Sequence, residues 1–149
     1  MKWYFEIKEQ VNLINEVLIS LKQPLLLENQ YFIIDEMTAE YYLRLKYSAP
    51  SRINFIITIS PHGTSIDVDR AMEAFNVGIE FINNNKADYR ALFLILFTSR
   101  IKIEYCGSNY TKIYFYDESG HCVKTLKYVT GLYLKIGCKT KEYPPIYSK

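Results

Sequence analysis

Short stretches of alternating apolar and polar residues follow one another between Arg100 and Gly137. In residues 101–105, isoleucine or tyrosine alternates with lysine or glutamate, the period of two expected of a strand with one buried face. Further strands are predicted over residues 112–116, 123–129 and 132–136, with small or polar turn residues between them. The pattern predicts an antiparallel meander.

The first half of the chain predicts a second meander. Residues 41–47 and 53–59 alternate in the same way, and a third short strand contains residues 66–68. Residues 25–27 and 31–34 are compatible with a further hairpin, although the first of these runs also fits an extended loop.

Apolar residues at helical spacing predict about three helices. The first covers residues 4–22 and is ended by Pro24; its apolar stripe consists of Ile7, Val11, Ile14, Leu18 and Leu21. Asp69 is the expected N-cap of the second, whose stripe consists of Met72, Phe75, Ile79 and Ile82. The third covers residues 86–99, where the apolar run also fits a strand but the length favours a buried helix.

These elements predict an α+β fold with antiparallel meander sheets and about three helices. At 149 residues the chain has the size of one domain and is long enough to bury roughly two thirds of its unfolded surface. The sequence contains no internal repeat, low-complexity segment or linker. We therefore expect a single globular domain over residues 1–149.

The charge is distributed unevenly along the chain. Lys and Arg against Asp and Glu give 9 − 12 = −3 for residues 1–98 and 9 − 4 = +5 for residues 99–149. A basic region with interleaved tyrosines attracts phosphate groups, but the overall isoelectric point of about 8.3 is below that of a typical nucleic-acid binder. A solvated basic sheet face is the ordinary explanation, and we expect nucleic acid to be an unlikely partner.

The cysteines Cys106, Cys122 and Cys138 are odd in number, lack CxxC spacing and follow no secretory signal. We therefore expect a reducing, cytoplasmic compartment in which none of the three carries a disulfide or a metal. Their spacings do not match those of zinc ligands. The longest apolar run, residues 91–97, is too short to span a bilayer, so no membrane association is expected.

The sequence offers no convincing catalytic constellation. His62 and His121 lie in predicted turns, and His121 and Cys122 would point to opposite faces of a strand because they are adjacent. Asp67 and Asp69 are too few oxygen donors for a calcium loop. No phosphate-binding loop, dinucleotide fingerprint, nucleophile elbow or HExxH motif occurs. We expect a protein that is not an enzyme and needs no cofactor.

Tyrosine is the unusual component, with 14 residues against a single tryptophan. Several predicted strands are apolar or aromatic on both faces, so either two layers cover both faces or one tyrosine-rich face stays exposed for a partner. If a partner binds, the candidate contact residues are Tyr42, Tyr105, Tyr114, Tyr116 and Lys112.

The segment Thr98–Tyr147, TSRIKIEYCGSNYTKIYFYDESGHCVKTLKYVTGLYLKIGCKTKEYPPIY, resembles the small cytosolic immunity proteins that accompany bacterial polymorphic toxins. The resemblance extends to the layout of helix, meander, helix, meander. It implies a non-enzymatic protein that binds a cognate toxin domain and neutralises it. The alternative is a nucleic-acid-binding module that uses the basic, tyrosine-rich C-terminal sheet, with stacking tyrosines and lysines.

Overall fold

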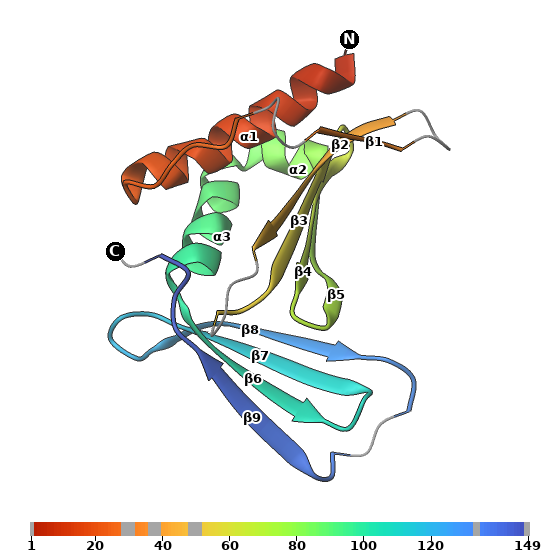
Figure 1. Ribbon diagram of the computed structural model, residues 1–149, viewed down its shortest axis with the longest axis vertical. Coiled ribbons are helices and arrows are strands. Elements are labelled where there is room, and N and C mark those ends of the chain that lie inside the picture. The colour runs from red at the N-terminus through yellow and green to blue at the C-terminus, as the bar shows by residue number, and fades with distance from the viewer. Residues whose placement is uncertain (1, 28–31, 36–39, 48–51, 133–134, 148–149) are drawn as a thin grey trace. The chain divides into compact units, whose positions relative to one another are not determined.

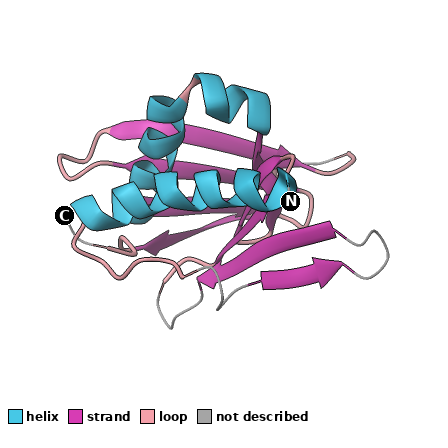
Figure 2. Ribbon diagram, turned by 90° about the horizontal axis from the view of Figure 1, so that it is seen from above, coloured by secondary structure: helices cyan, strands magenta, loops and turns pink. Residues whose placement is uncertain are grey.

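The computed structural model describes residues 2–27, 32–35, 40–47, 52–132 and 135–147. Its described residues form three helices and two antiparallel sheets, which confirms the predicted α+β class (Figures 1 and 2). Two compact units can be distinguished: Met1–Tyr47 with Asn54–Leu94, and Ser48–Ile53 with Ile95–Lys149. The expectation of a single globular domain stays a prediction.

The first unit contains a five-stranded meander and most of the helical residues (Figure 1). Its elements are α1 (Lys2–Ser20), β1 (Phe32–Asp35), β2 (Glu40–Tyr47), β3 (Phe55–Ser60), β4 (Gly63–Val68), β5 (Ala71–Gly78), α2 (Ile79–Asn84) and the larger part of α3 (Lys86–Thr98). Each strand pairs with the next, in the order β1-β2-β3-β4-β5. The predicted stripe of α1 is buried, and the helix packs against β2, β3 and β4.

Two predictions for this unit are wrong. Residues 71–78 form the strand β5 and not the beginning of a helix; only Ile79 and Ile82 of the predicted stripe are helical, in the short α2. Phe75 is buried as the direct partner of Ile66 on β4. Strand pairing, and not a helical stripe, therefore determines its position. Asp69 caps no helix: it occupies the turn between β4 and β5 with a φ of 53°.

Of the two runs considered for a hairpin near residue 30, the second contains most of the strand β1, and the first matches the alternative of an extended loop. Residues 25–27 form no strand, because the side-chain amide of Asn15 donates to the Leu26 carbonyl and its oxygen accepts from the Leu26 N–H. This segment is therefore attached to α1. Residues 28–31 lie outside the described residues, and the strand β1 pairs with β2.

A buried polar network connects four elements of the first unit, α1, β3, β4 and α3. The Thr64 hydroxyl on β4 donates to Oε1 of Gln10 on α1 at 2.6 Å and lies 2.7 Å from the Tyr89 hydroxyl on α3. The Gln10 amide also donates to the Ser60 carbonyl at 2.8 Å. Burial raises the pKa of the Tyr89 hydroxyl, and the hydrogen bond to Thr64 opposes that rise. Since every polar side chain is satisfied, the network fixes which residues of α1 and α3 face β4.

The second unit is a four-stranded sheet with the order β8-β7-β6-β9 (Figure 1). Its strands are β6 (Arg100–Cys106), β7 (Tyr110–Tyr116), β8 (Cys122–Val129) and β9 (Cys138–Tyr143). The first three form a meander, and β9 returns to pair with β6, which is the strand order of a Greek key.

The fourth strand differs from the sequence prediction. Residues 132, 135 and 136 are not in a strand, and residues 133–134 lie outside the described residues. Leu132 is 97% exposed and Ile136 is 72% exposed, so neither residue packs into a buried sheet face. Gly131 and Gly137, each with a φ of 67°, turn the chain, and β9 begins at Cys138.

A pair of glycines in the first sheet provides a test of its geometry. Gly63 on β4 has a φ of 145°, and a Cβ at this position would overlap the Val77 carbonyl oxygen. Its direct partner on β5, Gly78, has a φ of −71° and open space around it. We expect Gly63→Ala to lower the free energy of unfolding by about 2 kcal/mol or more, since only glycine adopts this conformation without strain.

The matched control is Gly78→Ala, which is expected to change the free energy of unfolding by no more than about 0.5 kcal/mol. Denaturant unfolding of the two variants measures both values. Equal effects of the two substitutions would contradict the close approach of β4 and β5 at this position.

Candidate functional site

The two faces of the second sheet have opposite chemical character. In the β6–β7 register Ile101 lies opposite Phe115 and Ile103 opposite Ile113, and all four side chains are fully buried. Successive residues of a strand point to opposite faces, so the residues between them lie together on the other face. We call this other face the cationic tyrosine face; on β6 and β7 it consists of Arg100, Lys102, Glu104, Cys106, Tyr110, Lys112, Tyr114 and Tyr116.

A stacked pair of tyrosines on β7 belongs to this face. The rings of Tyr114 and Tyr116 have centroids 6.4 Å apart and an interplanar angle of 17°. The Nζ atoms of Lys102 and Lys112 lie 5.2 and 4.9 Å from the Tyr114 centroid. The Arg100 guanidinium carbon lies 4.9 Å from the Tyr116 centroid. Each cation is close enough to the ring for a favourable cation–π interaction, so cations and rings hold one another in place.

Basic residues outnumber acidic ones on this face. Lys127 of β8 lies directly opposite Lys112, and Glu142 of β9 directly opposite Lys102. The Glu142 carboxylate pairs with the Arg100 guanidinium at 3.4 Å. The face therefore keeps an excess of positive charge and attracts anionic groups.

The second acidic group, Glu104, lies at the end of the face nearest the β6–β7 turn. Lys135 approaches it from the segment before β9, with 3.3 Å between Nζ and Oε1. The hydrogen bond to Glu104 raises the pKa of Lys135. The same ammonium lies 5.5 Å from the ring centroid of Tyr110, so the end of the face is also lined by a tyrosine and a cation.

The structure brings three of the five predicted contact residues together. Lys112, Tyr114 and Tyr116 share the cationic tyrosine face. Tyr105 lies opposite Thr111 and so belongs to the other face of the sheet, with the buried isoleucines. Tyr42 is half-buried on β2 in the first unit. Tyr105 therefore does not share the face of Lys112, Tyr114 and Tyr116.

The prediction that no cysteine carries a disulfide is wrong. Cys106 and Cys138 are bonded to each other, whereas Cys122 has a free, exposed thiol. The bond depends on a pairing that the sequence prediction lacked: β9 lies beside β6, and the two cysteines are direct partners with their Cα atoms 4.2 Å apart. This separation is close to the value of about 4.5 Å for directly opposed, non-hydrogen-bonded residues in antiparallel strands.

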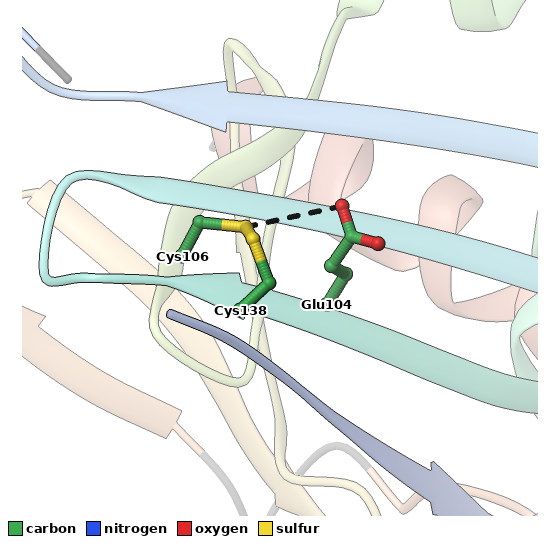
Figure 3. Close-up of side chains that lie close together, drawn as sticks. All are labelled: Glu104, Cys106 and Cys138. Atoms are coloured by element: carbon green, nitrogen blue, oxygen red, sulfur yellow. Dashed lines mark hydrogen bonds between the residues drawn. A yellow bond between two sulfur atoms is a disulfide. The ribbon is translucent and has the colours of Figure 1, made fainter. Parts of the chain in front are cut away.

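Glu104 completes a small cluster with the two cysteines (Figure 3). The carboxylate lies on the same face of β6 as Cys106, two residues before it, and Oε1 is 3.9 Å from the Cys106 Sγ. One ligand atom of each residue lies within 4.8 Å of the others. The signal for this cluster in the sequence is the spacing of Glu104 and Cys106, which places both on one strand face.

The histidines are both exposed in the structure. His62 follows Pro61 in the turn between β3 and β4. The His121 Nδ1 lies 3.7 Å from a carboxylate oxygen of Asp117, and the backbone N–H of His121 donates to the other oxygen of that carboxylate. The Cys122 thiol donates to the Lys124 carbonyl. These contacts account for His121 and Cys122 as parts of the hairpin between β7 and β8.

Comparisons with protein-family models, with curated proteins and with solved structures found no significant match for this chain. None of the described helices combines the length and the apolar character needed to cross a bilayer. The functional argument is therefore carried by the residues of the second sheet.

The disulfide gives a test of how β9 is attached to the sheet. It closes a loop with a sequence separation of 32, for which loop-closure entropy predicts a stabilisation of about 3.5 kcal/mol. Cys138→Ser is expected to lower the free energy of unfolding by that amount under oxidising conditions. Denaturant unfolding measures it, and Cys122→Ser serves as the control with no expected change. A difference between wild type and Cys138→Ser that persists after full reduction would contradict this assignment.

Proposed function

We propose that the protein is a non-enzymatic binding module whose partner is another protein with an acidic surface. The cationic tyrosine face is the contact surface. The observation that carries the proposal is the stacked pair Tyr114 and Tyr116 with Arg100, Lys102 and Lys112 placed over the rings. Tyrosine and arginine are enriched among the residues that dominate binding energy at protein interfaces.

The geometry of the rings favours a protein over a nucleic acid. Proteins that bind single strands offer open aromatic faces on which bases stack. Here the ammonium groups of Lys102 and Lys112 lie over the Tyr114 ring, and the Tyr116 ring is stacked beside it. A base would have to displace a cation from its ring, whereas a carboxylate of a protein partner reaches the same cations without disturbing the stack.

The class of partner follows from charge and from the resemblance of residues 98–147 to immunity proteins. Residues 99–149 carry nine basic and four acidic residues, which suits an acidic partner surface. Under the immunity interpretation this partner is the toxin domain encoded beside the gene, and binding blocks its active site or its folding. A cytoplasmic location belongs to the same proposal, because an immunity protein of this kind meets its toxin there.

Truncation of one central tyrosine tests the proposal. We expect Tyr114→Ala to weaken binding to the product of the neighbouring reading frame about thirtyfold, which corresponds to about 2 kcal/mol. The matched control is Tyr105→Ala, because Tyr105 is also half-buried but lies on the other face of the sheet. Isothermal titration calorimetry gives both affinities, and circular dichroism verifies that both variants are folded. Equal losses for the two variants would contradict the choice of face.

Co-expression tests the immunity interpretation directly. Cells that produce the neighbouring gene product are expected to grow when this protein is present, and the two proteins are expected to elute together on size exclusion. Persistent toxicity with abundant folded protein, and no complex, would refute it.

The nucleic-acid alternative is favoured by a separate observation, the row of lysines formed by Lys112 and Lys127 beside the tyrosines. A single-stranded oligonucleotide tests it by salt titration. Micromolar binding that weakens steeply with salt, because counterions are released, would support that alternative. Binding to a protein partner through tyrosine anchors is expected to depend less on salt.

A further inference from the structure

We propose that the Cys106–Cys138 pair, when reduced, forms a zinc site together with Glu104. The inference does not rest on the proposed partner: it is argued from the geometry at the end of the β6–β9 pair, where Glu104 also belongs to the cationic tyrosine face. Two thiolates and a carboxylate are ligands that Zn²⁺ accepts, and their ligand atoms already lie within 4.8 Å of one another.

The backbone fixes the three ligands in one place. Cys106 and Cys138 are direct partners across β6 and β9, and Glu104 lies opposite Thr140 on the same two strands. β6 is an inner strand of its sheet, held by β7 on one side and β9 on the other. Opening the S–S bond therefore leaves both thiols on adjacent strands, so the site is assembled before the metal arrives.

Access to the site is different for the two sulfurs. Cys106 is buried, with 1% of its surface exposed, whereas Cys138 is exposed. A reductant and a metal ion therefore approach from the side of Cys138. Figure 3 shows the carboxylate of Glu104, two residues before Cys106 on β6, directed toward the disulfide, with a dashed line to the Cys106 sulfur.

Formation of the site is a balanced exchange. A dithiol of the thioredoxin class attacks the Cys138 sulfur as a thiolate, the S–S bond breaks, and Cys106 leaves as a thiolate. The second thiol of the reductant then attacks the mixed disulfide and releases Cys138, so that the reductant is oxidised to its own disulfide and two thiols remain on the protein. Binding of Zn²⁺ then displaces the protons of these two thiols.

Lys135 changes its role when the metal binds. In the disulfide-bonded protein its ammonium pairs with Oε1 of Glu104 at 3.3 Å, and this contact holds the carboxylate at the end of the face. A zinc ion with two thiolates and one carboxylate carries a net charge of −1, by the arithmetic 2 − 3 = −1. The ammonium beside it balances that charge. A water molecule would complete a four-coordinate site, as in zinc sites with three protein ligands.

The site predicts a specific binding pattern for the reduced full chain. The protein is reduced with a phosphine, which converts the disulfide to two thiols and becomes a phosphine oxide with oxygen from water. After addition of ZnCl₂ and removal of excess metal, native mass spectrometry is expected to find one zinc per chain, with a dissociation constant of about 1 µM or below. Co²⁺ in place of zinc is expected to show thiolate-to-metal charge-transfer absorption.

Three variants define the ligands. Cys138→Ser is expected to lose the charge-transfer absorption and at least tenfold in zinc affinity. Glu104→Gln is expected to keep the absorption but to bind zinc more weakly, and because it retains the disulfide its fold is verified in the oxidised state. Cys122→Ser is the control and is expected to bind like wild type, since Cys122 is the one cysteine outside the cluster.

Several outcomes would overturn the proposal. These are a reduced wild type that retains no zinc, equal zinc binding by wild type and Cys138→Ser, or loss of binding in Cys122→Ser. Thermal unfolding covers the case in which reduction loosens the sheet: ZnCl₂ is expected to raise the melting temperature of the reduced wild type and not that of Cys138→Ser. A reduced wild type that zinc does not stabilise would count equally against the site.

Discussion

The alternation of side chains along β6 and β7 is the constraint on which the second sheet and its candidate site depend. Ile101, Ile103, Ile113 and Phe115 are fully buried on one face, and a shift of register by one residue would expose all of them. The burial of these four residues therefore determines the position of every residue between them. The stacked tyrosines and the cations over their rings lie where they do because the isoleucines and the phenylalanine are held on the opposite face.

The return of β9 to β6 adds a second feature to the same face. Its pairing places Glu142 opposite Lys102 and Cys138 opposite Cys106. The first contact offsets part of the positive charge, and the second covalently joins β6 to β9 at one end. If β9 had paired with β8, as in a simple meander, Cys106 and Cys138 would not be direct partners. Both the disulfide and the proposed zinc site therefore depend on the Greek-key order.

Local patterns predicted the elements more successfully than their pairing. The alternation in residues 41–47 and the apolar run in residues 91–97 identified β2 and α3, because each is a local property of the chain. The segment 71–78 failed because Met72 and Phe75 fit a helical stripe, while hydrogen bonding to β4 makes it a strand. The hydrophobic periodicity of a single segment does not reveal which other strand it will pair with.

For the candidate site, too, the face on which each residue lies was predictable from the sequence, whereas the contacts that depend on strand pairing were not. The pattern of residues 112–116 already placed Tyr114 and Tyr116 on one face of the strand and Ile113 and Phe115 on the other. The structure retains that arrangement. Alternation also placed Tyr105 with Ile101 and Ile103, so its separation from the other two tyrosines required only the register between β6 and β7. The disulfide was not predictable, because an odd number of cysteines and their spacings do not reveal that residues 106 and 138 lie on paired strands.

The most direct test of the central claim is hydroxyl-radical footprinting of the protein alone and in complex with the neighbouring gene product. Mass spectrometry measures the oxidation of each tyrosine, and Met72 in the first unit, which is 64% exposed, serves as the reference. The cationic tyrosine face predicts strong protection of Tyr114 and Tyr116 in the complex and little change at Tyr105. Protection of Tyr105 or Tyr42 with unchanged oxidation of Tyr114 and Tyr116 would contradict it.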